Sequence, residues 1–149
     1  MHQVFLLRHA KSSWKNLSSN DIDRPLNKRG KTDAKNLAHF LAKNKINIKE
    51  VICSPSKRSL DTYRIIKTSL NKKHVFTIND KIYECSESVL IKLINKISID
   101  TLIIGHNPSI TNTINILCRC KIINIPTCTL VKIIVEKGYF LSDITKPVK

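Results

Sequence analysis

Two pairs of residues in this sequence are suited to binding and transferring a phosphoryl group: Arg8 with His9, and Arg58 with His106. A guanidinium carries a planar fork of N–H donors that matches phosphate oxygens. A neutral imidazole has a lone pair that can attack phosphorus, and the cation beside His9 should lower the pKa of its ring. His106 could donate a hydrogen bond to the oxygens that gain charge during transfer.

Two further segments predict helix N-termini near these residues. In Ser54-Pro55 and in Asn107-Pro108, a favourable N-cap residue precedes a proline, which is common at the first helical position. The first N–H groups of a helix and the positive end of its dipole attract anions. We therefore expect Asn107 to bind phosphate together with the arginines and His106.

The spacing of apolar residues predicts strands that alternate with helices. Strands are expected at Val4–Leu7, Glu50–Cys53, His74–Ile78 and Thr101–Ile104, with a final antiparallel pair at Thr129–Val135 and Tyr139–Leu141. Helices are expected at Asn27–Lys45, Lys57–Leu70, Val89–Ile97 and Ser109–Leu117. This alternation indicates an α/β fold, a three-layer sandwich in which helices flank a mostly parallel central sheet.

The chemically distinctive segments all follow predicted strands. Arg8-His9 ends the first strand, and Ser54–Arg58, Tyr83-Glu84 and Gly105–Pro108 follow the next three. Ligands of such sheets bind at the carboxyl ends of the strands. Segments far apart in the chain are therefore expected to meet at one rim.

The composition is strongly basic, with 26 Lys and Arg against 11 Asp and Glu and a formal net charge of +15. Such a charge is typical of proteins that bind nucleic acid. The lysines are dispersed, however, and the abundance of Lys, Ile and Asn fits a genome rich in A/T codons. We favour this compositional explanation over a nucleic-acid groove, although a positive field would attract phosphorylated substrates of any kind.

Length and residue content predict a single domain over residues 1–149. No run of 18 apolar residues occurs and the N-terminus lacks a secretory signal, so we expect a cytoplasmic protein without a membrane partner. The five cysteines are an odd, scattered set, and Cys118-x-Cys120 is not a zinc spacing, which favours reduced thiols. Without a Gly-x-x-x-x-Gly-Lys loop or an acidic cluster, neither a cofactor nor a metal ion is expected.

Four motifs in chain order resemble those of the histidine phosphatase superfamily, the phosphoglycerate mutase-like fold, and most of all its small SixA-type phosphohistidine phosphatases. The motifs are Leu6-Leu7-Arg8-His9-Ala10-Lys11-Ser12-Ser13-Trp14, Asp23-Arg24-Pro25-Leu26 with Arg29-Gly30, Ser54-Pro55 with Arg58 and Thr62, and Gly105-His106-Asn107-Pro108. They extend over nearly the whole chain. The resemblance implies a metal-independent phosphatase in which His9 becomes a phosphohistidine intermediate that water hydrolyses, while Arg8, Arg58 and His106 hold the phosphoryl group.

The resemblance also bears on proton donation, because larger members of the family protonate the leaving oxygen with a carboxylic acid. Glu84 lies in the corresponding stretch of this chain, and Asp21 and Asp23 are rival candidates. Arg24 could line the entrance of the site or pair with an acid such as Asp21, and we favour the pairing.

The resemblance implies phosphohistidine on a protein as the leading substrate. An imidazole leaves more readily than an alkoxide, so a weak signal for a general acid is compatible with such a substrate. The alternatives are a small phosphomonoester handled by the same chemistry, and a basic nucleic-acid-binding module with a degenerate site. A short chain with few insertions implies an open site, and we expect a monomer.

Overall fold

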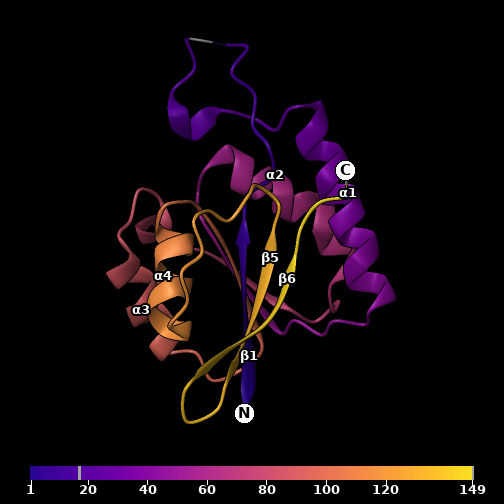
Figure 1. Cartoon of the computed structure of the whole chain (residues 1–149). Helices are drawn as coiled ribbons and strands as arrows, with labels where there is room; N and C mark the ends of the chain where they lie inside the picture. Colours follow the sequence, from indigo (N-terminus) through magenta and orange to yellow (C-terminus); the bar gives the residue numbers. More distant parts are fainter. Residues whose placement is uncertain (17, 149) are drawn as a thin grey trace.

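The computed structural model describes residues 1–16 and 18–148, and its core is a six-stranded sheet (Figure 1). The strands are β1 (His2–Arg8), β2 (Glu50–Cys53), β3 (Val75–Ile78), β4 (Thr101–Gly105), β5 (Leu130–Val135) and β6 (Tyr139–Thr145). Their order across the sheet is β3-β2-β4-β1-β5-β6. The first four strands pair in parallel, whereas β5 is antiparallel to both β1 and β6. The predicted mostly parallel sheet with a final antiparallel pair is confirmed.

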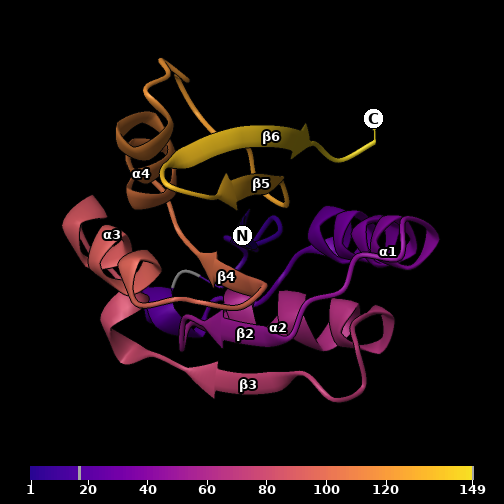
Figure 2. The ribbon, with the colours of Figure 1, turned by 90° about the horizontal axis from the view of Figure 1, so that it is seen from below.

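Four α-helices cover the two faces of this sheet, as Figure 2 shows. They are α1 (Lys28–Lys43), α2 (Lys57–Ile66), α3 (Glu87–Asn95) and α4 (Ser109–Cys118), with short 3-10 turns at Asp21–Asp23, Lys67–Ser69 and Asp80–Ile82. Helices α1 and α2 lie on one face and α3 and α4 on the other (Figure 2). The three-layer sandwich expected from the sequence is therefore confirmed.

The central strand β1 contributes side chains to both hydrophobic cores. Phe5 and Leu7 pack in the cluster that includes α1 and α2, while Val4 and Leu6 pack in the cluster that includes α3 and α4. Successive side chains of a strand point to opposite faces of the sheet. A continuous apolar run is therefore needed in a strand that has helices on both sides.

The carboxyl ends of β1, β2 and β4 lie side by side. Arg8 pairs with Gly105, and Cys53 pairs with Ile104. The chain continues this pairing beyond the strands, because the His9 N–H donates to the Gly105 carbonyl at 3.1 Å. The segments that follow these three strands consequently share one rim of the sheet.

Each predicted element exists, but several predicted ends are wrong. Helix α2 stops at Ile66 rather than Leu70, because the chain tightens into the 3-10 turn at Lys67–Ser69. Strand β6 continues beyond Leu141 to Thr145, which pairs with Leu130 at the start of β5. The polar residues in that extension conceal the strand in the sequence, because an edge strand exposes much of its length to water.

Gly30 allows α1 to approach the loop that follows β1. A Cβ atom at this position would lie 2.1 Å from the Lys11 carbonyl oxygen, a distance that no real contact allows. The same loop is tied to the helix by the Asn27 N–H, which donates to the Lys11 carbonyl at 3.0 Å. Helix α1 therefore sets the position of the segment that begins with His9.

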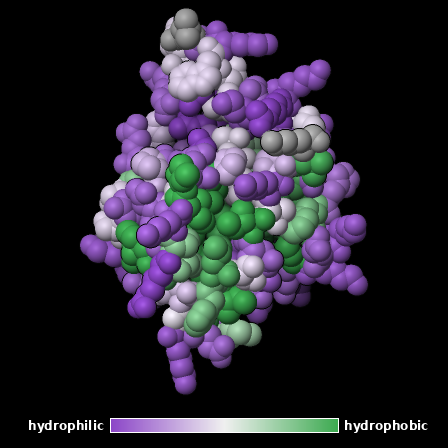
Figure 3. Space-filling view, in the orientation of Figure 1, coloured by the Kyte–Doolittle hydropathy of each residue, from purple (hydrophilic) through white to green (hydrophobic). Residues whose placement is uncertain are grey.

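The face of the molecule seen in Figure 3 carries apolar side chains over β5 and β6, surrounded by hydrophilic ones. Phe140 and Ile144 of the edge strand β6 are among the exposed hydrophobic residues. None of the helices in the described part of the chain has the length and hydrophobicity needed to cross a bilayer.

Candidate active site

A pocket of about 320 Å³ opens at the carboxyl rim of the sheet. Its lining residues are Arg8, His9, Lys11, Ser12, Trp14, Asp21, Arg24, Arg58, Tyr83, Glu84, His106, Asn107 and Thr127. All six site residues predicted from the sequence are in this set. The lining holds four cationic side chains and two carboxylates, so the pocket is positive before its histidines are counted, which suits a dianionic phosphoryl group.

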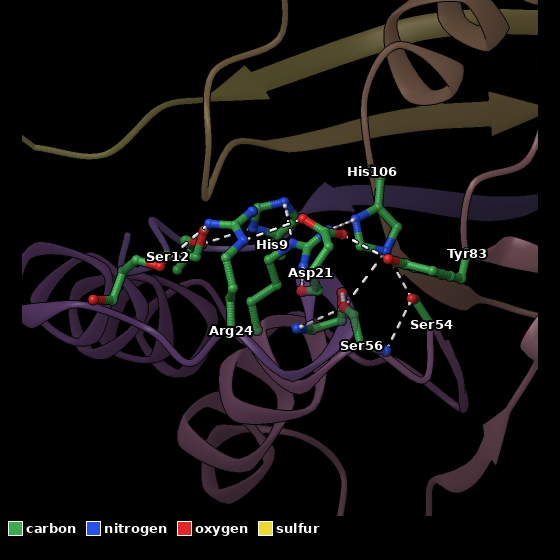
Figure 4. Close-up of polar contacts among 12 residues, drawn as sticks. His9, Ser12, Asp21, Arg24, Ser54, Ser56, Tyr83 and His106 are labelled. Atoms are coloured by element: carbon green, nitrogen blue, oxygen red, sulfur yellow. Dashed lines mark hydrogen bonds and ion pairs between the residues drawn. The ribbon is translucent and has the colours of Figure 1, made fainter. Parts of the chain in front are cut away.

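His9 has the tautomer that a nucleophile needs. Its Nδ1 lies 2.7 Å from the Ala10 carbonyl, which can only accept, so Nδ1 carries the proton, and Nε2 holds the lone pair that accepts from Arg58 Nε–H at 3.3 Å. Burial, joined by the positive charges around it, lowers the pKa of His9 to about 3. The ring is therefore neutral at physiological pH and presents Nε2 to the pocket (Figure 4).

The turn after His9 is fixed by a hydroxyl from α2. The Ala10 N–H donates to Thr62 Oγ1 at 3.0 Å, and this hydroxyl in turn donates to the Arg58 carbonyl at 2.8 Å. Thr62 is fully buried. One side chain thus couples the position of His9 to the helix that carries Arg58.

Arg58 lies between the two histidines. Its Nε is 3.3 Å from His9 Nε2, and its Nη2 is 3.5 Å from His106 Nδ1. The two imidazole centroids are 5.1 Å apart. Nη1 donates to the main-chain oxygen of Asp21 at 2.7 Å, and Nη2 donates to Asp21 Oδ2 at 3.0 Å. The guanidinium is therefore held rigidly beside both rings.

Arg8 contributes from the end of β1. Its Nη1 donates to the Ile125 carbonyl at 3.0 Å, and its Nε is buried without a partner among the residues that the structure describes. Burial and the charge of Arg58 lower the pKa of Arg8 from 12.5, yet a guanidinium stays charged at neutral pH. The charges of Arg8 and Arg58 are close enough to act on each other, which makes this part of the pocket favourable for an anion.

His106 is oriented by Ser54 rather than by solvent. Its Nε2 lies 2.7 Å from Ser54 Oγ, and its Nδ1 faces Arg58 Nη2, which can only donate. Burial, followed by the charge of Arg58, lowers the pKa of His106 to about 4. Nδ1 is therefore the nitrogen that faces the phosphate site, and Nε2–H is anchored on the protein.

This contact overturns the prediction that Ser54 caps a helix. Helix α2 begins at Lys57, as predicted, but its N-cap is Ser56, whose Oγ accepts from the Ser59 N–H at 3.3 Å. Ser54 is fully buried, and its hydroxyl is committed to His106. The sequence carried no signal for this pair, because the two residues are brought together only by the adjacency of β2 and β4.

Asn107 lies in the pocket wall, but its side chain is engaged by the protein. Its Nδ2 donates to Asn124 Oδ1 and to the Ile125 carbonyl, each at 2.9 Å, and its Oδ1 accepts from the Thr111 N–H at 3.2 Å. Helix α4 starts at Ser109, as predicted, but its N-cap is Pro108 rather than Asn107. Contact between Asn107 and phosphate stays a prediction, while its side chain secures the segment after His106.

Asp21 is held as a carboxylate. The hydroxyl of Tyr83 donates to Oδ2 at 2.6 Å, Arg58 binds the same oxygen, and Arg24 Nε donates to Oδ1 at 3.1 Å. These contacts, the hydrogen bond of Tyr83 foremost, lower the pKa of Asp21 to about 2. The predicted pairing of Arg24 with Asp21 is confirmed, and Arg24 also lines the pocket beside Ser12, to whose Oγ it donates at 2.7 Å (Figure 4).

Glu84 lies at the edge of the pocket and is exposed to solvent. Its backbone adopts the left-handed conformation, with φ of 53°. Asp23 is exposed in the 3-10 turn and is not among the residues that line the pocket. Across residues 1–16 and 18–148, no group of three His, Cys, Asp or Glu side chains is arranged to hold a metal ion.

Some pocket residues were not predicted from the sequence. Lys11 and Ser12 belong to the turn after His9, and their nearness to that residue in the chain was a usable signal. Thr127 had no such signal. It is brought to the pocket because the next residue, Cys128, donates its N–H to the Arg8 carbonyl at 2.9 Å.

Comparison with known proteins agrees with this geometry. A solved structure assigned as the phosphohistidine phosphatase SixA of Agrobacterium tumefaciens superposes with a TM-score of 0.90 at 23% identity, covering 98% of each chain. The structure of the protein histidine phosphatase SixA complexed with tungstate gives 0.82 at 21% identity, covering 97% of each chain. At these identities the likeness shows a shared fold.

Sequence comparison identifies the family. An acid phosphatase of Mycobacterium tuberculosis is 30% identical over 73 residues, which are 48% of this chain and 36% of that protein. The chain spans about a third of the length of the curated relatives it matches. The model of the histidine phosphatase superfamily (branch 1) matches residues 4–89, more than half of the chain, with Arg8, His9, Arg58 and Glu84 inside the match. The chain therefore belongs to the histidine phosphatase superfamily.

Proposed function

We propose that this protein is a phosphatase that removes phosphate from phosphohistidine on a protein through a covalent intermediate on His9. The observation that carries the proposal is the neutral, Nδ1-protonated imidazole of His9, whose Nε2 faces Arg58 and His106 in one positive pocket. This arrangement supplies a nucleophile and preorganised donors for the oxygens of the transferred group.

In the proposed first step, the Nε2 lone pair of His9 forms a bond to phosphorus while the bond from phosphorus to the substrate imidazole breaks. The electron pair of that bond leaves with the substrate nitrogen, which is protonated from solvent. In the second step water attacks phosphorus, the bond to Nε2 breaks, and inorganic phosphate is released. Arg8 and Arg58 stabilise the charge on the oxygens in both steps, and His106 donates to them once the phosphoryl group has brought a proton onto its Nδ1.

The nature of the acids in the pocket supports a nitrogen leaving group. Asp21 is ionised and bound by two arginines and Tyr83, so it has no proton to give. Glu84 is exposed at the pocket edge. A phosphoryl group on nitrogen needs less proton donation than one on an alkoxide oxygen, and the similarity of the fold to SixA structures points to the same substrate class.

The proposal is tested by incubating the protein with a histidine-phosphorylated protein and measuring the phosphate released. We expect His9→Ala to reduce the rate by at least about a thousandfold, because the nucleophile is lost. An acid-labile phosphoryl group should appear on the wild-type chain after rapid quenching and should be absent from the variant. Release by His9→Ala at the wild-type rate would exclude the mechanism.

A small phosphomonoester is the second candidate, and the position of Glu84 favours it. An acid at the pocket edge could protonate an alkoxide as it leaves. A panel of phosphomonoesters assayed beside the phosphohistidine protein distinguishes the two substrates. Activity confined to the monoesters would replace the first proposal with the second, and we expect a chelator to change neither activity.

A further inference from the structure

A second depression, separate from the pocket around His9, lies between α1 and α2 and has a volume of about 530 Å³. We call it the helix groove. Its lining residues are Pro25, Leu26, Lys31, Lys35, Lys57, Asp61, Arg64 and Ile65. None of these residues takes part in the phosphoryl transfer proposed above.

The helix groove is positively charged, with four cations and one carboxylate in its lining. Asp61 lies 3.8 Å from Lys57 Nζ and 3.1 Å from Arg64 Nη1, so it neutralises charge on the α2 side only. Within the described part of the chain, Lys31 and Lys35 form no ion pair. They are four residues apart on α1, so they occupy the same face of the helix and both are exposed.

The floor of the helix groove is apolar. Leu26 is 4% exposed and Ile65 is half-buried, with Pro25 beside them. No aromatic side chain lines the groove, whereas surfaces for single-stranded nucleic acid stack bases on aromatic rings. Cationic walls above an aliphatic floor instead match a protein segment with an acidic face and an apolar face.

The helix groove begins where the active-site pocket ends. Arg24 lines the pocket, and the next two residues, Pro25 and Leu26, line the groove. Likewise Arg58 lines the pocket and its neighbour Lys57 lines the groove. A substrate whose phosphoryl group reaches His9 could therefore extend into the groove.

From this juxtaposition we infer that the helix groove docks an acidic, amphipathic segment of the phosphorylated protein substrate. The inference rests on the proposed function, because it names the class of protein that presents the phosphohistidine. Its carboxylates contact Lys31 and Lys35, and its apolar face covers Leu26 and Ile65. The groove then contributes to the affinity for protein substrates and leaves the chemistry at His9 unchanged.

The test uses two synthetic peptides that carry one phosphohistidine and an amphipathic helix. One peptide has glutamates on the polar face and the other has glutamines. The kcat and KM of each peptide are measured at low and high salt, together with hydrolysis of free phosphohistidine. The protein variants are Lys31→Glu with Lys35→Glu, and a control of Lys92→Glu with Lys96→Glu. The control has the same spacing and charge change, on α3 and its C-cap at the opposite face of the sheet.

We expect the wild-type protein to have a KM for the acidic peptide about tenfold below that for the glutamine peptide, with the difference reduced by salt. The Lys31→Glu, Lys35→Glu variant should lose this preference and hydrolyse free phosphohistidine at the wild-type rate. The α3 control should keep the preference. Loss of the preference in both variants would overturn the inference, because the net charge alone would then explain it.

A measurement of peptide binding tests the docking inference independently of the proposed phosphatase activity. The Kd of the unphosphorylated acidic peptide, measured by fluorescence anisotropy, should rise about tenfold in the Lys31→Glu, Lys35→Glu variant. An unchanged Kd would overturn the inference even if phosphohistidine is hydrolysed. A DNA duplex that binds more tightly than the acidic peptide and depends on the same two lysines would overturn it in favour of a nucleic-acid partner.

Discussion

At the scale of single residues, the two carboxylates of the active-site pocket differ in their capacity to donate a proton. Asp21 is bound by Tyr83, Arg58 and Arg24, and its pKa is lowered to about 2. It is therefore a positioning residue that holds Arg58 beside the histidines. Among residues 1–16 and 18–148, no donor is bound to the Glu84 side chain, which is exposed at the pocket edge, and Glu84 is therefore the candidate for proton donation.

Substituting these two acids should have different effects on oxygen and nitrogen leaving groups. We expect Glu84→Gln to reduce the hydrolysis of a phosphomonoester by about a hundredfold and that of phosphohistidine by less than about threefold, because only the alkoxide needs the proton. Asp21→Asn should reduce both rates to a similar extent, because it loosens Arg58. Steady-state kinetics on both substrates check the prediction, and equal losses in Glu84→Gln would contradict it.

At the scale of secondary structure, α1 supports the active site without contributing a residue to the pocket lining. It packs so closely on the loop after β1 that Gly30 faces the Lys11 carbonyl, two residues beyond His9. A glycine inside a helix normally costs stability. Here the close approach that it permits is the physical reason for its presence.

Gly30→Ala should therefore destabilise the fold and displace the nucleophile together. Overpacking of this kind costs about 1–3 kcal/mol of the free energy of unfolding. We expect a lower midpoint in urea unfolding and a reduced kcat. Gly138→Ala is the matched control, because the nearest atom to its added Cβ would be 3.7 Å away on Phe140 and its φ is not positive. Equal stability losses in the two variants would argue against the close-approach explanation.

The sequence predicted the elements better than the contacts among them. The apolar runs specified β1, β2 and β4, because both faces of these strands are buried, whereas polar residues concealed the end of the edge strand β6. The same sequence misplaced the helix cap at Ser54, because the choice between Ser54 and Ser56 depends on which hydroxyl His106 engages. Local propensity could not resolve that competition, since both residues are good caps.

At the scale of the whole molecule, the two buried imidazoles link the stability of the fold to pH. Burial lowers the pKa of His9 to about 3 and that of His106 to about 4, whereas a histidine in the unfolded chain has a pKa of about 6.5. Between these values the unfolded chain binds more protons than the folded one. The contribution of these two imidazoles to the free energy of unfolding is therefore fully present above pH 6.5. It is lost as the pH falls from 6.5 toward the folded pKa values and no longer changes below them.

Urea unfolding at a series of pH values should show this loss, on the order of 2 kcal/mol or more between neutral and mildly acidic buffer. The double variant His9→Gln with His106→Gln should have a flatter dependence over the same interval. His39→Gln, at an exposed position on α1, should keep the wild-type slope. A wild-type slope in the double variant would mean that other groups cause the acid sensitivity.

The sequence by itself determined which candidate residues meet at the rim, because Arg8, His9, Arg58 and His106 each lie at or soon after the end of a strand whose apolar run is visible in the chain. Parallel strands bring such ends to one rim whatever their order. Only the tertiary structure decided which hydrogen bonds and ion pairs connect the residues of the rim. Contacts such as Ser54 with His106 and Asp21 with Arg58 join residues far apart in sequence, and they depend on the order β3-β2-β4-β1 and on the position of the loop after β1. That order is fixed by packing across the sheet, which no local pattern records.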